Sequence, residues 1–132
     1  MHILAHGIDI VDIDRLGQVL DNHQSHFLDR VFSPDEQAYC FANPKRCNEH
    51  LAGRFAAKEA ILKAIGTGWS RGIAWTEVEV VRTPSGRPTV RLSGRAAEEA
   101  AAAGITQWQL SISHIKTHAI ASAIALGAPR KP

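Results

Sequence analysis

The chain has 132 residues and only two cysteines, Cys40 and Cys47, which lie seven positions apart. This spacing contains no C-x-x-C pair and no second metal-type pair, so it argues against both a disulfide framework and a structural zinc site. We interpret both cysteines as free thiols in a protein of a reducing compartment.

Long apolar segments and blocks of like charge are also lacking. The run 119–126 is interrupted by Ser122 and is far shorter than a bilayer span, and no basic region precedes an apolar stretch at the N-terminus. We therefore expect a soluble, cytoplasmic protein without a membrane partner. Lys and Arg number 15 against 13 Asp and Glu, and the two signs are interleaved, which argues against a nucleic-acid partner. An acidic partner or a phosphorylated small molecule fits this charge better.

The apolar residues that are present, 45% of the chain, suffice for one domain with its own core over 1–132. Their periodicity predicts an α+β fold, with a mainly antiparallel sheet and a long helix packed on it. Asp12 and Ser33 are the expected N-caps of two helices. Strands are expected at 3–11, 77–81, 88–92, around 108–112 and, centrally, at 119–126; helices are expected after Asp12, after Ser33, at 48–65 and at 93–103.

Asp9 is the first candidate for chemistry, because it lies between Ile8 and Ile10 in an apolar predicted strand. A carboxylate in such a place is costly unless a cation or hydrogen-bond donors compensate it. The alternative is that Asp9 points to solvent from the polar face of an edge strand. Gly7 beside it would let a ligand approach the backbone closely.

Glu59 shares the otherwise apolar stripe of the long helix with Leu51 and Phe55, and Lys63 follows one turn later. A Glu four residues before a Lys is usually a solvated helix pair. On an apolar stripe, however, a carboxylate is either paired or coordinates a hard cation. Asp9 and Glu59 together would form a two-carboxylate Mg²⁺ site that takes its remaining ligands from water and from the phosphates of a substrate.

Basic residues surround the same helix. Arg54 and Lys58 are one turn apart, with Lys45 and Arg46 upstream, so we expect these four cations at the same end of the molecule as the metal. Phosphate would be their natural ligand, although most basic residues on a helix are simply solvated.

Two further features have competing interpretations. The amides of Gly66-Thr67-Gly68 would suit a phosphate, but the position after a helix favours a C-cap. His114 ends a predicted strand, where it would either line a site or play a structural part.

Six motifs in chain order resemble those of the holo-[acyl-carrier-protein] synthases, the small 4′-phosphopantetheinyl transferases. The long segment 54–68 is the most specific of them. The motifs are Gly7-Ile8-Asp9-Ile10-Val11, Phe32-Ser33-Pro34-Asp35-Glu36, Gly53-Arg54-Phe55-Ala56-Ala57-Lys58-Glu59-Ala60, Lys63-Ala64-Ile65-Gly66-Thr67-Gly68, Gly86-Arg87-Pro88 and Ser111-Ile112-Ser113-His114.

The resemblance implies the 4′-phosphopantetheinyl transferase fold, and a homotrimer with active sites between neighbouring subunits. It implies transfer of the phosphopantetheine arm of coenzyme A to a serine of apo acyl carrier protein, with release of adenosine 3′,5′-bisphosphate, which activates the carrier for fatty acid biosynthesis. In such a reaction the enzyme chiefly positions the pyrophosphate and neutralises its charge.

The resemblance also implies roles for individual residues. Asp9 and Glu59 would hold Mg²⁺, and Lys63 would neutralise phosphate charge and relay a proton. The serine proton would go to a metal-bound water or to a carboxylate such as Asp9. Arg15 would dock the acidic carrier protein. The residues implied to bind coenzyme A are Lys45, Arg46, Arg54, Lys63, Gly66, Gly68, Ser113 and His114.

One departure from the family pattern follows His114, where Ile115 stands in place of the usual small hydroxylated or acidic residue. Two other functions remain open at this point. A Mg²⁺-dependent hydrolase of the coenzyme A pyrophosphate would use the same metal, lysine and phosphate pocket. A non-catalytic module that binds a phosphate ligand or a carrier protein would have little use for the carboxylate pair.

Overall fold

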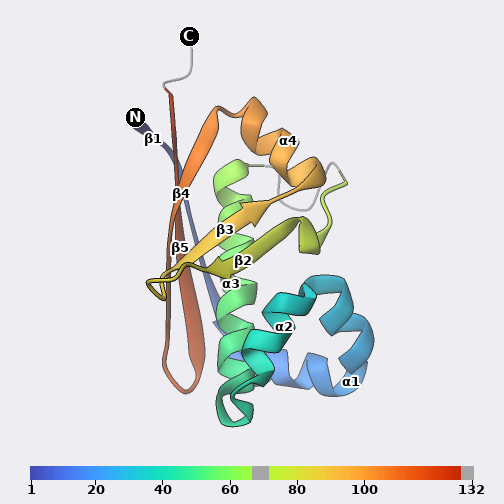
Figure 1. Ribbon diagram of the computed structural model, residues 1–132. Coiled ribbons are helices and arrows are strands. Elements are labelled where there is room, and N and C mark those ends of the chain that lie inside the picture. The colour runs from blue at the N-terminus through green and yellow to red at the C-terminus, as the bar shows by residue number, and fades with distance from the viewer. Residues whose placement is uncertain (67–71, 129–132) are drawn as a thin grey trace.

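The computed structural model describes residues 1–66 and 72–128 and has the predicted mixture of helices and antiparallel strands (Figure 1). The elements in chain order are β1 (His2–Asp12), α1 (Ile13–Val31), α2 (Pro34–Phe41), the 3-10 turn η1 (Pro44–Arg46), α3 (Cys47–Ile65), the 3-10 turn η2 (Trp75–Glu77), β2 (Val78–Arg82), β3 (Pro88–Leu92), α4 (Gly94–Ala102), β4 (Ile105–His114) and β5 (His118–Gly127).

The long helix α3 lies between two antiparallel sheets (Figure 1). On one side is a three-stranded sheet in the order β1-β5-β4, so β5 is the central strand, as predicted for 119–126. On the other side is the β2–β3 hairpin. The main core fills the space between these layers, and a second core lies beneath α1 and α2.

Small residues allow α3 to lie close to the three-stranded sheet. Every second residue of β5 is a buried alanine that faces the core, from Ala119 to Ala125. At Gly7 of β1 the contact is closer still, because a Cβ there would overlap the backbone carbonyl of Ala60. The expectation that Gly7 admits a ligand is therefore wrong, since the backbone that approaches it is that of α3.

The predicted helix ends are confirmed by their hydrogen bonds. Asp12 Oδ1 accepts from the backbone N–H of Arg15 at 3.1 Å. Ser33 and Glu36 form a reciprocal capping box at the start of α2. Gly66 ends α3 with a φ of 93°, the left-handed conformation that glycine adopts without strain, which confirms the C-cap interpretation. Gly68 lies outside the described residues.

The other face of the three-stranded sheet carries exposed isoleucines. Ile8 is 53% exposed, Ile10 is 62% exposed and Ile120, the register partner of Ile10, is 39% exposed. No element within residues 1–66 and 72–128 packs over these side chains. Among the same residues, no helix combines the length and the apolarity needed to cross a membrane.

Candidate functional site

Asp9 has the cationic partner that its apolar surroundings require. Lys63 Nζ lies 3.0 Å from Asp9 Oδ1 and also donates to the backbone carbonyl of Ile8 at 3.0 Å. The Asp9 side chain is 21% exposed and that of Lys63 55%. Asp9 therefore does not simply point to solvent; it lies on the side of β1 that meets α3.

Glu59 is half-buried on α3, one turn before Lys63 and on the same helix face. Two carboxylates and one ammonium thus gather where the C-terminal half of α3 crosses β1. We call Asp9, Glu59 and Lys63 the carboxylate site. Alternation along β1 and the helical period on α3 bring these residues together.

The donor set of the carboxylate site suits one class of metal. The described residues contain no group of three or more His, Cys, Asp or Glu that could hold a metal ion. Asp9 and Glu59 supply two carboxylates, and this fits Mg²⁺, which commonly binds through one or two carboxylates and keeps water or phosphate oxygens as its other ligands.

A second group lies at the opposite end of α3. Lys45 and Arg46 are exposed in η1, directly before the helix. His114 Nδ1 lies 3.3 Å from Glu49 Oε2 in the first turn of α3. We call Lys45, Arg46 and His114 the basic cluster.

Since an α-helix rises about 1.5 Å per residue, Lys63 lies roughly 24 Å along α3 from its first residue, Cys47. The expectation that all four cations surround the metal end is therefore wrong.

Arg54 faces away from the carboxylate site, because nine residues of helix place it about 180° around α3 from Lys63. Its side chain is buried, with the guanidinium 3.9 Å from the centre of the Tyr39 ring. Burial lowers the pKa of Arg54, opposed by the nearby Cys40 and Tyr39. Its Nε has no hydrogen-bond partner among the described residues. It lines a cavity of about 310 Å³ together with Arg82 and Arg91.

Lys58 does not lie with the cations that were expected to bind phosphate. Its side chain is fully buried and forms an ion pair with Glu36 at 2.8 Å. The expectation of an exposed cation at this position is wrong, because the partner comes from another helix and is invisible in the local pattern.

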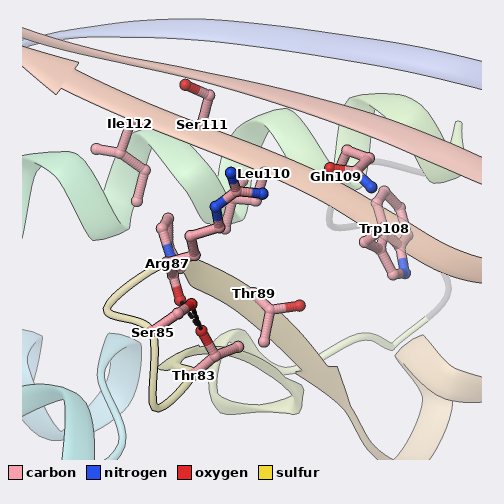
Figure 2. Close-up of a pocket in the computed structure, with 10 residues that line it drawn as sticks. Thr83, Ser85, Arg87, Thr89, Trp108, Gln109, Leu110, Ser111 and Ile112 are labelled. Atoms are coloured by element: carbon pink, nitrogen blue, oxygen red, sulfur yellow. Dashed lines mark hydrogen bonds between the residues drawn. The ribbon is translucent and has the colours of Figure 1, made fainter.

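A larger cavity, of about 590 Å³, separates the β2–β3 hairpin from β4; we call it the hairpin cavity. Figure 2 shows Arg87 extending from the hairpin toward β4, with Trp108 and Gln109 along the strand. Thr83 and Ser85 are joined by a hydrogen bond of 2.8 Å at its rim. Sequence reasoning gave these residues no role, although Gly86-Arg87-Pro88 was among the motifs that resemble the family.

The remaining predicted residues are dispersed. Ser113 and His114 line a small apolar cavity of about 200 Å³ with Ile10 and Ile115. Arg15 is exposed in the first turn of α1. Gly66 is exposed just beyond α3. The structure thus joins Asp9 with Lys63, and places Lys63 at the other end of α3 from Lys45 and Arg46.

Comparisons with known proteins agree with this architecture. Residues 5–123 match the model of the 4′-phosphopantetheinyl transferase superfamily. The holo-[acyl-carrier-protein] synthase of Gloeobacter violaceus is 46% identical over 122 residues, 92% of this chain and 91% of the relative. That of Koribacter versatilis is 44% identical over 122 residues, 92% of this chain and 97% of the relative.

Among solved structures, the holo-[acyl-carrier-protein] synthase of Helicobacter pylori in complex with coenzyme A superposes with a TM-score of 0.80 at 31% identity, covering 92% of this chain and 99% of the other. The chain therefore belongs to the 4′-phosphopantetheinyl transferase superfamily and, within it, to the enzymes called holo-[acyl-carrier-protein] synthases. The predicted family and fold class are confirmed.

Proposed function

We propose that this enzyme transfers the phosphopantetheine arm of coenzyme A to a serine of apo acyl carrier protein. The observation that carries the proposal is the carboxylate site, in which Asp9 and Lys63 are in contact and Glu59 lies one turn away, within segments that match the family. Coenzyme A is the ligand named for the Helicobacter pylori relative, and a carrier protein is the substrate in the name of each relative.

The reaction exchanges one phosphorus–oxygen bond for another. The serine oxygen of the carrier attacks the phosphorus on the pantetheine side, and the bond from that phosphorus to the bridging oxygen breaks. Its electron pair leaves with adenosine 3′,5′-bisphosphate. Lys63 Nζ would neutralise the charge that develops on the phosphate oxygens, and Asp9 is a candidate acceptor for the serine proton.

Mg²⁺ is the proposed cofactor, held by Asp9 and Glu59. When bound, it would supply positive charge to the pyrophosphate. Lys63 already donates to Asp9 Oδ1, which leaves Oδ2 to face a cation. Lys63 thereby orients the Asp9 carboxylate.

We further propose a homotrimer whose active sites lie between neighbouring subunits. Lys45 and Arg46 directly precede α3, whereas Lys63 lies roughly 24 Å along the helix from its first residue. A neighbouring subunit would bring its Lys45, Arg46 and His114 to this chain's carboxylate site. The exposed face of Ile8, Ile10 and Ile120 is a suitable apolar surface for such contacts.

Other parts of coenzyme A would contact the residues implied by the family. The hairpin cavity is within the usual size range of ligand sites and offers Arg87 and several polar side chains. Arg54, Ser113, Gly66 and Gly68 keep their proposed roles in substrate binding, alongside the basic cluster.

Arg15 is the proposed contact for the acidic carrier protein, because it is exposed on α1 and not paired with a carboxylate among the described residues. Arg15→Glu should weaken carrier binding and leave the affinity for coenzyme A unchanged. We propose that the enzyme acts in the cytoplasm and serves fatty acid biosynthesis through this carrier.

Release of adenosine 3′,5′-bisphosphate, followed by liquid chromatography, tests the proposal. The transferase requires apo carrier protein for release, and a carrier whose serine is replaced by alanine should not support it. Release without any carrier would instead establish a hydrolase. Binding of coenzyme A with no release under either condition would contradict both activities.

A further inference from the structure

An ion pair that the transfer reaction does not use is buried where α2, α3 and the β2–β3 hairpin meet. Lys58 Nζ lies 2.8 Å from Glu36 Oε1, and both side chains are 0% exposed. Burial lowers the pKa of Lys58, while the carboxylate of Glu36 opposes the shift. With no accessible surface, neither group can touch a substrate. Any effect on catalysis must pass through the backbone that the pair holds.

Lys58 is bonded to the segment that leads into the hairpin. Its ammonium donates to the carbonyl of Val78 at 2.6 Å and to that of Trp75 at 3.1 Å, besides Glu36. All three N–H bonds of the ammonium are therefore used. Trp75 belongs to η2 and Val78 begins β2, so this one side chain fastens the start of the hairpin to the middle of α3.

Glu36 holds the same strand from the side of α2. Its Oε2 accepts from the backbone N–H of Val80 at 2.8 Å, and its Oε1 accepts from that of Ser33 at 2.8 Å. The Ser33 hydroxyl donates to Glu79 Oε2 at 2.5 Å, and Glu79 in turn pairs with Arg91 on β3. Both strands of the hairpin are thus tied to the N-terminus of α2.

Stability alone is a weak reason for such an arrangement. A buried ion pair loses the hydration of both charges, and well-packed apolar residues of similar volume are often as stabilising or more so. What an apolar pair cannot supply is bonds to specific backbone atoms. Three hydrogen bonds fix the hairpin relative to Lys58 and Glu36: those to the carbonyls of Trp75 and Val78 and that from the N–H of Val80. All three can form only in one placement of the hairpin.

In the placement that these hydrogen bonds fix, the β2–β3 hairpin forms one wall of the hairpin cavity. Thr83, Arg87 and Thr89 line that wall, and residues of β4 line the other (Figure 2). Lys58 also directly precedes Glu59 of the carboxylate site. The pair therefore holds the hairpin that forms one wall of the cavity, and its lysine is the sequence neighbour of a carboxylate-site residue.

We propose that Glu36 and Lys58 are positioning residues that hold the β2–β3 hairpin against α3 in the placement that coenzyme A binding requires. This inference rests on the proposed function in one respect, that the hairpin cavity receives part of coenzyme A. The pair acts on the wall of the cavity and not on the reacting atoms.

The test removes both charges at nearly constant volume, with the double variant Glu36→Gln/Lys58→Met. Kinetics are measured at a temperature where circular dichroism shows the variant fully folded. We expect the KM for coenzyme A to rise about tenfold and kcat to change less than about threefold, because ground-state binding is lost and the chemistry is not. Amide hydrogen exchange in residues 78–92 should become about tenfold faster, with β1, β4 and β5 unchanged.

The matched control is Leu20→Ala. Leu20 is buried in the second core on α1, which is not among the elements that the pair joins, so the control lowers stability without releasing the hairpin. It should leave the KM for coenzyme A and the exchange of 78–92 at wild-type values. An equal rise in KM in this control would show that stability alone is responsible and would overturn the proposal.

Wild-type KM and wild-type exchange in a folded double variant would also overturn it. Should the double variant not fold, Glu36→Gln alone is assayed, with the same expected direction. If neither folds, the pair is a requirement of folding and the positioning role is rejected. Failure of the proposed function is recognised separately, because the wild-type enzyme would then modify no carrier protein. Hydrogen exchange would still show whether the Glu36–Lys58 pair holds the hairpin.

Discussion

Glu59 is the residue on which the proposed metal site depends most. Glu59→Gln keeps the size of the side chain and removes the charge, so we expect kcat to fall by about 100-fold or more, in the range seen when one electrostatic contact to a transition state is lost. The thermal unfolding midpoint should change little, because the side chain is only half-buried. Activity of the variant equal to that of the wild type would remove Glu59 from the site.

His50 gives the protein a predictable response to acid. Burial lowers the pKa of His50, and the charge of Arg54 lowers it further. As the pH falls below about 6.5, the ordinary histidine pKa, the unfolded chain therefore takes up a proton that the folded chain resists, and the free energy of unfolding decreases.

His50→Gln should lose less stability than the wild type between pH 7.5 and pH 5.5. Urea unfolding at the two pH values measures the difference. A larger loss in the variant would mean that the folded state favours the protonated imidazole.

Among single residues, the sequence predicts that Asp9 needs a compensating partner, but it does not predict that Lys58 is buried in an ion pair. Asp9 lies between two isoleucines in a strand, so its need for a partner is visible locally. Lys58 lies on a helix with ordinary spacing, and its partner Glu36 is on another helix. The same is true of Arg54, whose contact with Tyr39 is a tertiary one. Local patterns carry no information about such pairs.

The strands and helices are predictable because their signals are local. Alternating residues indicate β2, β3 and β4, the apolar run 119–126 indicates the central strand β5, and the capping box at Ser33 marks the start of α2. The hairpin cavity is not predictable in this way, since it depends on how the β2–β3 hairpin lies relative to β4. Only that placement makes the side chain of Arg87 part of the cavity wall.

The contact between β1 and α3 provides a prediction at the scale of elements. Gly7→Ala would place a methyl group on the carbonyl of Ala60, so the helix and the strand must separate. We expect a loss of about 1–3 kcal/mol in the free energy of unfolding, typical of overpacking. Because the shift moves Lys63 relative to Asp9, kcat should fall as well.

Gly17→Ala is the control for Gly7→Ala. Its Cβ would meet only the side-chain nitrogen of Asn48, at 3.2 Å, which can move. Denaturant unfolding and initial rates compare the two variants. Equal stability of Gly7→Ala and the wild type would contradict the close contact between strand and helix.

In the whole molecule, the distance between the ends of α3 carries the argument for shared active sites. Seventeen positions separate Arg46 from Lys63, and helical rise alone indicates that they are far apart. This spacing in the sequence already argues against placing Arg46 beside Lys63 within one chain. The proposed completion of the site by a neighbouring subunit depends on quaternary structure, which no local sequence pattern indicates.

Mixing two inactive variants tests this arrangement. Glu59→Gln keeps the basic cluster, and Lys45→Glu/Arg46→Glu keeps the carboxylate site. Refolded together in equal amounts, they should regain about a quarter of wild-type activity, since one in four interfaces between two randomly mixed subunit types is intact. Sedimentation analysis checks that trimers have formed. Mixed trimers without activity would contradict a site shared between subunits.

The most direct measurement is the intact mass of apo acyl carrier protein after incubation with this enzyme, coenzyme A and Mg²⁺, beside a reaction that contains EDTA. The account predicts a gain of one phosphopantetheine group, located on a serine, in the reaction with Mg²⁺ and no gain with EDTA. An unchanged carrier mass in the presence of Mg²⁺ would contradict the proposed transfer, and a gain that persists in EDTA would contradict the role of the metal.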